Sequence, residues 1–231
     1  DVGFLKWKAL TSGADVLDIG GESTRPGAAE VSASEELTRV LPAIRGLRRE
    51  VALPISLDTY KSTVAQAALD AGADIVNDIG ALRFDAQMVT LVAREKVPVV
   101  LMHMQGTPRT MQAEPRYTDV VREVRDFLAA EFYEAMDAGI AAEAIVIDPG
   151  IGFGKTVDQN FELIRRLDEL PALGRPVLVG FSRKSSLGRV LGDPDAKTGP
   201  LSASLAVAVA AYERGATIIR AHDVRETVEA L

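Results

Sequence analysis

Residues 71–77 read AGADIVN, and the same pattern returns as SGADVLD at residues 12–18 and as RGATIIR at residues 214–220. Each copy joins the end of a helix to a glycine, an alanine, a polar residue and a pair of apolar residues. Glycine commonly ends helices, and the apolar pair belongs to a run of the kind found in buried parallel strands. The pattern indicates a repeated βα unit, an architectural signal that implies no chemistry by itself.

Strand-like runs of this kind recur along the chain, and nearly every one ends in a polar residue or a glycine. They are residues 15–20 (DVLDIG), 54–59 (PISLDT), 74–80 (DIVNDIG), 98–104 (PVVLMHM), 144–150 (AIVIDPG), 176–182 (PVLVGFS) and 217–223 (TIIRAHD). Helical spacing of apolar residues fills residues 34–50, 62–71, 86–95, 118–138, 160–167 and 200–214, and Pro42 predicts a kink or a later start in the first of these helices. Strands that alternate with helices predict a parallel sheet with right-handed crossovers.

The length of 231 residues suits one α/β domain, predicted to span residues 1–231. A closed (β/α)8 TIM barrel needs eight strands. The runs number one fewer, and residues 1–13 look like the last part of a helix that leads into the first run. The chain also starts at Asp1 rather than at Met. We therefore expect an N-terminally incomplete TIM barrel that lacks its first strand in this sequence. The alternative is an open doubly wound sheet.

Composition excludes several classes of protein. No apolar stretch reaches the roughly 18 residues of a membrane span. The absence of cysteine excludes disulfides, thiolate metal sites and a cysteine nucleophile, and it fits a cytoplasmic location. The net charge of −7, with scattered Lys and Arg, argues against a nucleic-acid partner. We expect small-molecule substrates, with neither nucleic acid nor membrane as a partner.

Carboxylate and amide side chains stand at the ends of central runs, at Asp58, Asn77 and Asp148. The carboxyl ends of parallel strands share one rim, so these groups are expected to converge there. Such a set suits the N–H donors of a planar heterocycle, and its burial would be costly without a ligand. The alternative is that each residue caps the helix that follows it.

Cationic groups follow the last two runs, at Lys184, Arg220 and His222. Arg220 and His222 are two residues apart and therefore point to the same side of a strand. Barrel loops in this region often bind phosphate, so the sequence suggests a heterocycle with a phosphate or pyrophosphate arm. A structural ion pair is the alternative, and for Arg25 the alternative is a solvated surface arginine.

Other motifs favour structural interpretations. His103 lies in a buried-looking run and is interpreted as a core or rim histidine. Residues 150–155 (GIGFGK) fall one residue short of a Walker A loop and are interpreted as a flexible strand-to-helix loop. Two histidines without cysteine argue against zinc, whereas magnesium could keep mostly water and phosphate as ligands.

Seven strings together resemble the dihydropteroate synthase family of pterin-binding enzymes. They are DIGGESTRPGA (18–28), SLDTYK (56–61), GADIVNDI (72–79), LMHMQGTP (101–108), DPGIGFGK (148–155), VGFSRKS (179–185) and RAHDV (220–224). The resemblance spans nearly the whole chain. It implies a TIM-barrel transferase that acts on alkyl or aryl groups other than methyl and joins 6-hydroxymethyl-7,8-dihydropterin diphosphate to 4-aminobenzoate in folate biosynthesis. It also implies Mg²⁺, a homodimer and sulfonamides as inhibitors.

The resemblance assigns roles to residues. It implies that Asp58, Asn77, Asp148 and Lys184 hold the pterin ring in a pocket lined by Met102, Phe153 and Gly180. Arg220 and His222, assisted by Arg25, would hold the diphosphate, and Thr24, Arg25, Pro26 and Ser182 would lie near the aminobenzoate. The catalytic set would be Lys184, Asp148, Arg220 and His222. The magnesium-binding Asn of the family belongs to a first-strand motif without a counterpart here, so the metal ligand stays unassigned.

Two other functions remain open at this point. A pterin-binding methyltransferase of corrinoid systems would share the barrel and the acids, but the STRPG and SRK strings favour the synthase. A non-catalytic chain that binds only pterin is the other alternative.

Overall fold

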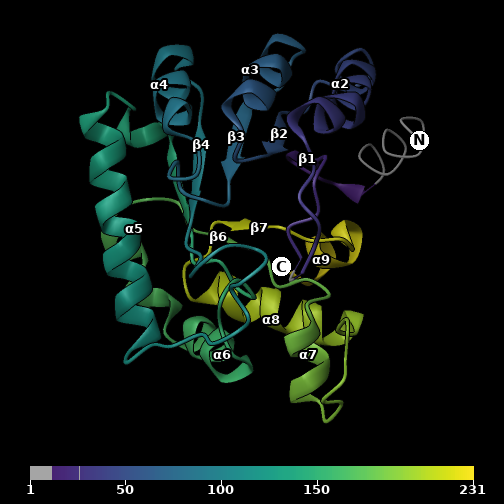
Figure 1. Ribbon diagram of the computed structural model, residues 1–231. Coiled ribbons are helices and arrows are strands. Elements are labelled where there is room, and N and C mark those ends of the chain that lie inside the picture. Colours follow the sequence, from purple (N-terminus) through teal and green to yellow (C-terminus); the bar gives the residue numbers. More distant parts are fainter. Residues whose placement is uncertain (1–11, 26) are drawn as a thin grey trace.

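The computed structural model describes residues 12–25 and 27–231, in which strands and helices alternate (Figure 1). The strands are β1 (Leu17–Gly20), β2 (Ile55–Asp58), β3 (Ile75–Asp78), β4 (Val99–Met102), β5 (Ile145–Asp148), β6 (Leu178–Val179) and β7 (Ile218–Ile219). The helices are α2 (Ala33–Arg48), α3 (Ser62–Asp70), α4 (Ala86–Glu95), α5 (Val120–Asp137), α6 (Val157–Arg165), α7 (Ser185–Val190), α8 (Leu201–Glu213) and α9 (Val224–Ala230), with 3-10 turns η1 (Ala142–Ala144), η2 (Leu167–Glu169) and η3 (Pro171–Leu173). Each predicted run contains one strand.

The strands pair in parallel and in chain order. One sheet has the order β1-β2-β3-β4-β5, and β6 pairs with β7. A parallel bridge between Ile147 and Val177 joins the two sheets. Doubly wound sheets reverse direction within the sheet, whereas a barrel adds each strand beside the preceding one. The order therefore excludes the doubly wound alternative and gives a (β/α)8-barrel fold, with the helices surrounding the strands in Figure 1.

The interval between β7 and β1 is spanned by side chains. Arg220, just after β7, places Nη1 3.1 Å from Oδ2 of Asp18 on β1. A closed barrel has eight strands, of which the described residues supply seven. The predicted end of a helix in residues 1–13 lies almost wholly outside the described residues.

Helix boundaries follow the predicted ranges to within a few residues, with one informative difference. Helix α2 runs through Pro42 without a later start. Its N-terminus is fixed at Ser32, whose side chain accepts from the Glu35 N–H, and its inner face buries Val40 and Ile44 on either side of the proline. Packing of this face outweighs the one backbone hydrogen bond that proline removes. Helix α9 was not anticipated.

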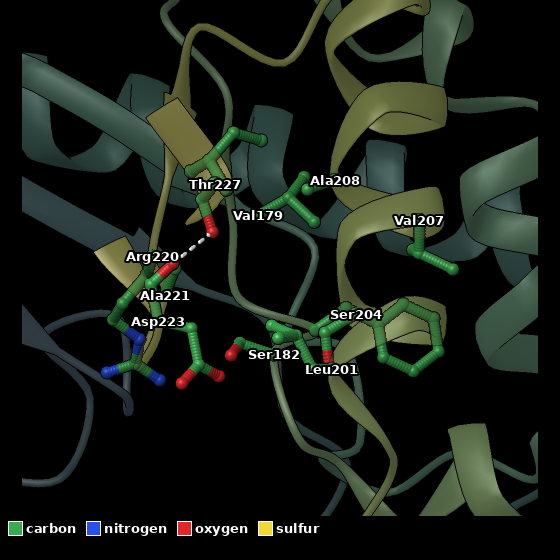
Figure 2. Close-up of a pocket in the computed structure, with 12 residues that line it drawn as sticks. Val179, Ser182, Leu201, Ser204, Val207, Ala208, Arg220, Ala221, Asp223 and Thr227 are labelled. Carbon is green, nitrogen blue, oxygen red and sulfur yellow. Dashed lines mark hydrogen bonds between the residues drawn. The ribbon is translucent and has the colours of Figure 1, made fainter. Parts of the chain in front are cut away.

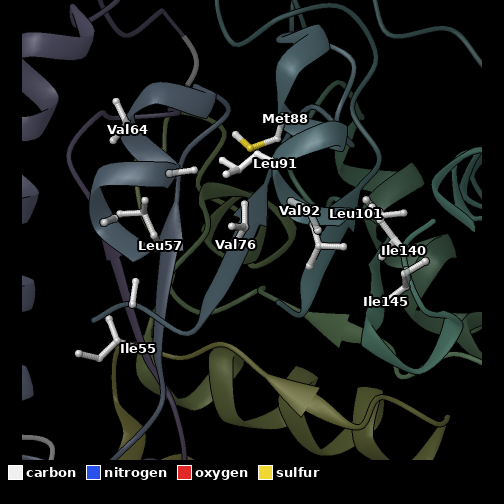
Figure 3. Packing of buried hydrophobic residues seen from close by; sticks show 14 of the residues in the cluster. Ile55, Leu57, Val64, Val76, Met88, Leu91, Val92, Leu101, Ile140 and Ile145 are labelled. Atoms are coloured by element: carbon white, nitrogen blue, oxygen red, sulfur yellow. The ribbon is translucent and has the colours of Figure 1, made fainter. Parts of the chain in front are cut away.

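Two apolar clusters lie between the strands and the helices. The larger packs β2 to β5 against α2 to α5, and Figure 3 shows Leu57, Val76 and Leu101 of three neighbouring strands within it. The second packs β5 and β6 against α5, α6 and α8. Gly72, Gly139 and Gly215 have φ of +109°, +95° and +97°, which confirms them as helix-ending residues. Within the described residues, no helix is both long and apolar enough to span a membrane.

Candidate active site

The acidic and amide residues converge at the carboxyl ends of the strands, as predicted. Asp58 on β2 lies opposite Asn77 on β3, and Asn77 Nδ2 donates to Asp18 Oδ2 at 3.4 Å. Asp148 ends β5, opposite Met102 on β4. The following helices have other N-cap residues, Lys61, Asp85 and Thr156, so helix capping does not explain this set.

Arg220 joins the acids across the barrel mouth. Its Nη1 lies 3.1 Å from Asp18 Oδ2 and 3.3 Å from Asp58 Oδ2. Burial lowers the pKa of Arg220, but Asp18 and Asp58 outweigh it and raise the pKa overall. Burial and the charge of Asp18 raise the pKa of Asp58 to about 7, although Arg220 opposes this. Asp18 belongs to the site and was missed as a member of it, although a polar residue inside an apolar strand run was the available signal.

Lys184 lies within electrostatic reach of Asp148 and Asp58. Its Nζ donates to the Ile151 carbonyl and lies 4.8 Å from the centroid of the Phe153 ring. Burial and the charge of Arg220 lower the pKa of Lys184 to about 7, against the influence of Asp148 and Asp58. The preceding Arg183 has φ of +57°, a left-handed backbone that few side-chain-bearing residues adopt. The two neighbouring side chains therefore have different partners: Arg183 pairs with Asp223, and Lys184 donates to the Ile151 carbonyl.

Asp148 is held by the loop that follows it. Its Oδ1 accepts from the Gly150 N–H at 2.7 Å. Burial raises the pKa of this carboxyl group, whereas Arg220 and the same hydrogen bond lower it. The charges of both Arg220 and Lys184 act on Asp148 and lower its pKa, so the three groups lie within electrostatic reach of one another.

The loop after β5 is tightly packed, so its interpretation as flexible is wrong. Gly150, Gly152 and Gly154 have φ of +66°, +81° and +64°, and a Cβ at Gly150 would lie 1.8 Å from the His103 carbonyl oxygen. Lys155, buried at 2% exposure, donates to the carbonyls of Gly150 and Phe153 at 2.9 Å each. Close backbone approach explains the glycines.

His103 is a buried residue on this loop's far side, which confirms the structural interpretation of it. Its Nδ1 lies 2.9 Å from Lys155 Nζ, and its ring packs edge-to-face on Phe127 with centroids 4.8 Å apart. Burial and the charge of Lys155 lower its pKa well below the ordinary value. Lys155 was overlooked because a buried lysine leaves no signal in the sequence.

His222 and Ser182 meet where β6 and β7 end. The His222 N–H donates to Ser182 Oγ at 3.1 Å, and His222 Nδ1 lies 3.2 Å from the same oxygen. Figure 2 shows Ser182, Arg220 and Asp223 around a cavity of about 10 Å³, room for one water at most. Burial and the charge of Arg183 lower the pKa of His222. The charges of Arg220 and Arg25 act in the same direction.

The loop between β1 and α2 contains Thr24 and Arg25, while Pro26 lies outside the described residues. Arg25 is exposed, and the Gly27 N–H donates to the Pro108 carbonyl of the loop after β4 at 3.3 Å. The two loops therefore meet over the rim.

Apolar side chains complete the pocket. Met102 and Phe153 belong to a small buried cluster at the strand ends with Ile79, Met104 and Met111. Gly180 leaves space for Arg220, because an added Cβ would lie 3.1 Å from its Nε. Strands and the loops after them thus carry the residues predicted for the pterin and the diphosphate at their carboxyl ends, with Arg220 directly paired to Asp58.

A barrel with acids facing cations across its mouth defines an α/β-barrel enzyme that holds a small polar ligand. A family model described as pterin binding enzyme matches residues 7–222. The dihydropteroate synthase of Synechocystis sp. is 48% identical over 215 residues, which are 93% of this chain and 74% of that protein. The chain belongs to the pterin-binding enzyme family and, within it, to the dihydropteroate synthases.

Solved structures agree. A Xanthomonas albilineans dihydropteroate synthase in complex with 7,8-dihydropteroate is 42% identical with a TM-score of 0.85, covering 99% of this chain and 80% of that one. A Yersinia pestis dihydropteroate synthase in complex with a sulfonamide drug is 44% identical with a TM-score of 0.91, covering 97% and 80%. These relatives favour the synthase over the methyltransferase.

Proposed function

We propose that this chain is a transferase that joins 6-hydroxymethyl-7,8-dihydropterin diphosphate to 4-aminobenzoate and releases pyrophosphate. The observation that supports it most is the convergence of Asp58, Asn77 and Asp148 with Lys184 and Arg220 on one rim. Carboxylates and an amide suit the N–H edge of a pterin, and guanidinium suits a diphosphate. The product complex of the Xanthomonas albilineans relative contains both halves of this chemistry.

The reaction divides between the two sides of the mouth. The bond between the pterin methylene carbon and the diphosphate oxygen breaks, and its electron pair leaves with pyrophosphate. Arg220 and His222 stabilise the charge that builds on the leaving group, and both ion pairs of Arg220 use Nη1, so its remaining donors can face that group. Asp148 stabilises the positive pterin, and Lys184 fixes its orientation.

The amine nitrogen then forms the new carbon–nitrogen bond. A neutral aryl amine is already nucleophilic, so no strong base is required, and its proton passes to solvent after attack. Thr24, Arg25, Pro26 and Ser182 are proposed to hold the aminobenzoate. The loop over the rim would exclude water, which competes for the same carbon.

We also propose Mg²⁺ as the cofactor, supported by the affinity of diphosphate oxygens for this ion. Among the described residues, no three His, Cys, Asp or Glu side chains gather as metal ligands. The protein ligands of the ion therefore stay unassigned, and no step above depends on it.

A homodimer in the cytoplasm completes the proposal. Large apolar side chains are exposed on α7 and α8 and beside them, with Leu191 at 65% and Tyr212 at 56% exposure. Such groups support a partner surface.

Calorimetry tests the proposal directly. The pterin diphosphate should bind in the absence of 4-aminobenzoate, and Mg²⁺ should strengthen this step. With both substrates present the protein should form dihydropteroate, and no production of dihydropteroate would overturn the proposal.

The activity should depend on pH around neutrality. Asp58 must be ionised to accept pterin N–H groups, so affinity falls as pH drops below about 7, the value to which burial and Asp18 raise its pKa. Lys184 must stay protonated, so affinity also falls above about 7, the value to which burial and Arg220 lower its pKa. A pterin without phosphate has no phosphate group that titrates in this range. Its affinity, measured between about pH 5 and about pH 9, should therefore follow a bell-shaped curve set by the protein groups. A flat profile would contradict both assignments.

A further inference from the structure

The loop of residues 22–25 and 27–31 is mostly exposed or half-buried, and among these residues only Val31, at its end, is buried. Ser23 and Arg25 are exposed, and a cavity of about 220 Å³ lies behind the loop, lined on its other side by Tyr60, Phe84 and residues 107–109. A loop with a cavity behind it depends on its anchors for position, because few apolar contacts hold it.

The Glu22 carboxylate joins the two ends of this loop, residues 22 and 31, which we call its neck. Glu22 Oε1 accepts from the Val31 N–H at 3.2 Å and from the Tyr60 hydroxyl at 3.0 Å. Lys61 Nζ donates to Glu22 Oε2, and it donates to Glu36 Oε2 on α2 at 2.6 Å. Both ends of the loop are therefore held through Glu22, and Glu22 is held through Lys61.

Lys61, Glu22 and Glu36 form a largely buried ionic cluster, which we call the clamp. The side chains of Lys61, Glu22 and Glu36 are 15%, 9% and 1% exposed. Burial lowers the pKa of Lys61, but its hydrogen bonds to the two glutamates outweigh this and raise the pKa overall. Without the lysine, two carboxylates would face each other with little water, a strongly unfavourable arrangement. Glu22 would relieve it by turning outward and releasing Val31.

The start of the loop also rests directly on this cluster. A Cβ at Gly21 would lie 2.7 Å from Glu36 Cγ, and Arg39 Nη1 donates to the Gly21 carbonyl at 2.7 Å. The backbone just before Glu22 is therefore rigid, and movement is confined to the loop beyond it. The two carboxylates that Lys61 binds do not belong to the pterin set.

We propose that Lys61 is a positioning residue for 4-aminobenzoate: through Glu22 it closes the neck of the loop that presents Thr24 and Arg25. The proposal rests on the proposed function, since it assigns the loop's substrate. It predicts unequal effects on the two substrates. Glu22 contacts the loop directly, whereas it reaches the apolar cluster of the pterin pocket only through the Tyr60 hydroxyl.

The test compares Lys61→Met with Lys197→Met, which removes a lysine from an exposed loop. In Lys61→Met the KM for aminobenzoate should rise about tenfold to a hundredfold, the effect of a displaced binding group. The dissociation constant of the pterin diphosphate should change by much less, because the hydrogen bonds of Lys61 go to Glu22 and Glu36 and not to the residues assigned to the pterin. Lys61→Arg, which keeps the charge, should restore most of the aminobenzoate affinity. Equal losses for both substrates would overturn the proposal.

Hydrogen exchange gives a readout that needs no substrate. The amides of residues 22–31 should exchange faster in Lys61→Met and at the wild-type rate in Lys197→Met. If Lys61→Met folds poorly, the double variant Lys61→Met/Glu36→Leu also removes the second carboxylate. Glu22 still lacks the lysine that holds it, so the loop amides should still exchange faster than in the wild type. Unchanged exchange in a folded variant would overturn the clamp. If Lys61→Met exchanges faster as expected but the wild-type protein forms no dihydropteroate, the clamp would stand and the proposed function would be overturned.

Discussion

Replacing Lys184 by alanine should lower kcat/KM for the pterin diphosphate by about 30- to 1000-fold, equivalent to about 2 to 4 kcal/mol. Lys184 lies over the Phe153 ring, beside the Ile151 carbonyl and within electrostatic reach of Asp148. A charged donor in this position makes a strong hydrogen bond to a ring acceptor. Its loss also leaves Asp148 with less positive charge nearby, so both sides of the pterin are affected.

Two further variants separate charge from packing. Lys184→Met keeps the aliphatic stem, which lies against Gly152, where an added Cβ would come within 3.1 Å of Lys184 Cδ. It should fold like the wild type and still lose most of the pterin affinity. Lys197→Ala, on an exposed loop, should behave as the wild type. Calorimetry with the pterin diphosphate measures the loss, and an unchanged dissociation constant would remove Lys184 from the pterin site.

Replacing Arg220 by methionine should slow pyrophosphate release by about 100- to 1000-fold, the usual effect of removing a donor to developing charge. A second effect follows from its ion pairs. Arg220 lowers the pKa of Asp58, so the variant should hold this carboxyl protonated to a pH above about 7. The acid limb of the pH–rate profile should therefore shift to higher pH. A rapid-quench assay of pyrophosphate release over a range of pH measures both effects.

Stability provides an independent check on Arg220. Asp58 holds its proton more tightly in the folded chain than in the unfolded one, because its folded pKa is raised. The folded state is therefore favoured as pH falls, and stability is lost as pH rises through the folded pKa. Arg220→Met should strengthen this trend, with a larger fall in Tm from about pH 6 to about pH 8 than in wild type. Arg166→Met, which breaks surface pairs with Asp119 and Glu169, is the control. An identical pH trend in both variants would exclude the Arg220–Asp58 pair.

The sequence was sufficient for the strands and for the rim on which Asp58, Asn77 and Asp148 meet. These positions follow from local patterns, since parallel strands bring their carboxyl ends together whatever the details of packing. Arg220 could be placed on the same rim but not paired, because its partner Asp18 is 202 residues away in the chain. Such a contact depends on how the barrel brings its first and last described strands together.

Packing also explains the remaining differences. The GIGFGK segment suggested freedom of movement because glycine is permissive, whereas the fold uses glycine there to bring two backbones close together. The buried Lys155 and the Lys61 clamp were missed for a related reason. A lysine in a loop looks solvated until tertiary structure surrounds it, and its partners come from elements that the sequence does not connect.

Two loops border the mouth of the barrel, the tightly packed loop at Gly150 and the exposed loop with Ser23 and Arg25. The contrast between these two walls affects which substitutions the enzyme can accept during evolution. At Gly150, two residues after Asp148 of the proposed pterin site, even a methyl group would collide with the chain opposite, so this position can hardly change. The wall formed by Ser23 and Arg25 is open to solvent and tolerates new side chains. Adaptation to an unfamiliar arylamine, or escape from a competing drug, would therefore be confined largely to one half of the pocket. A compound bound to the other half would leave the protein few routes to resistance.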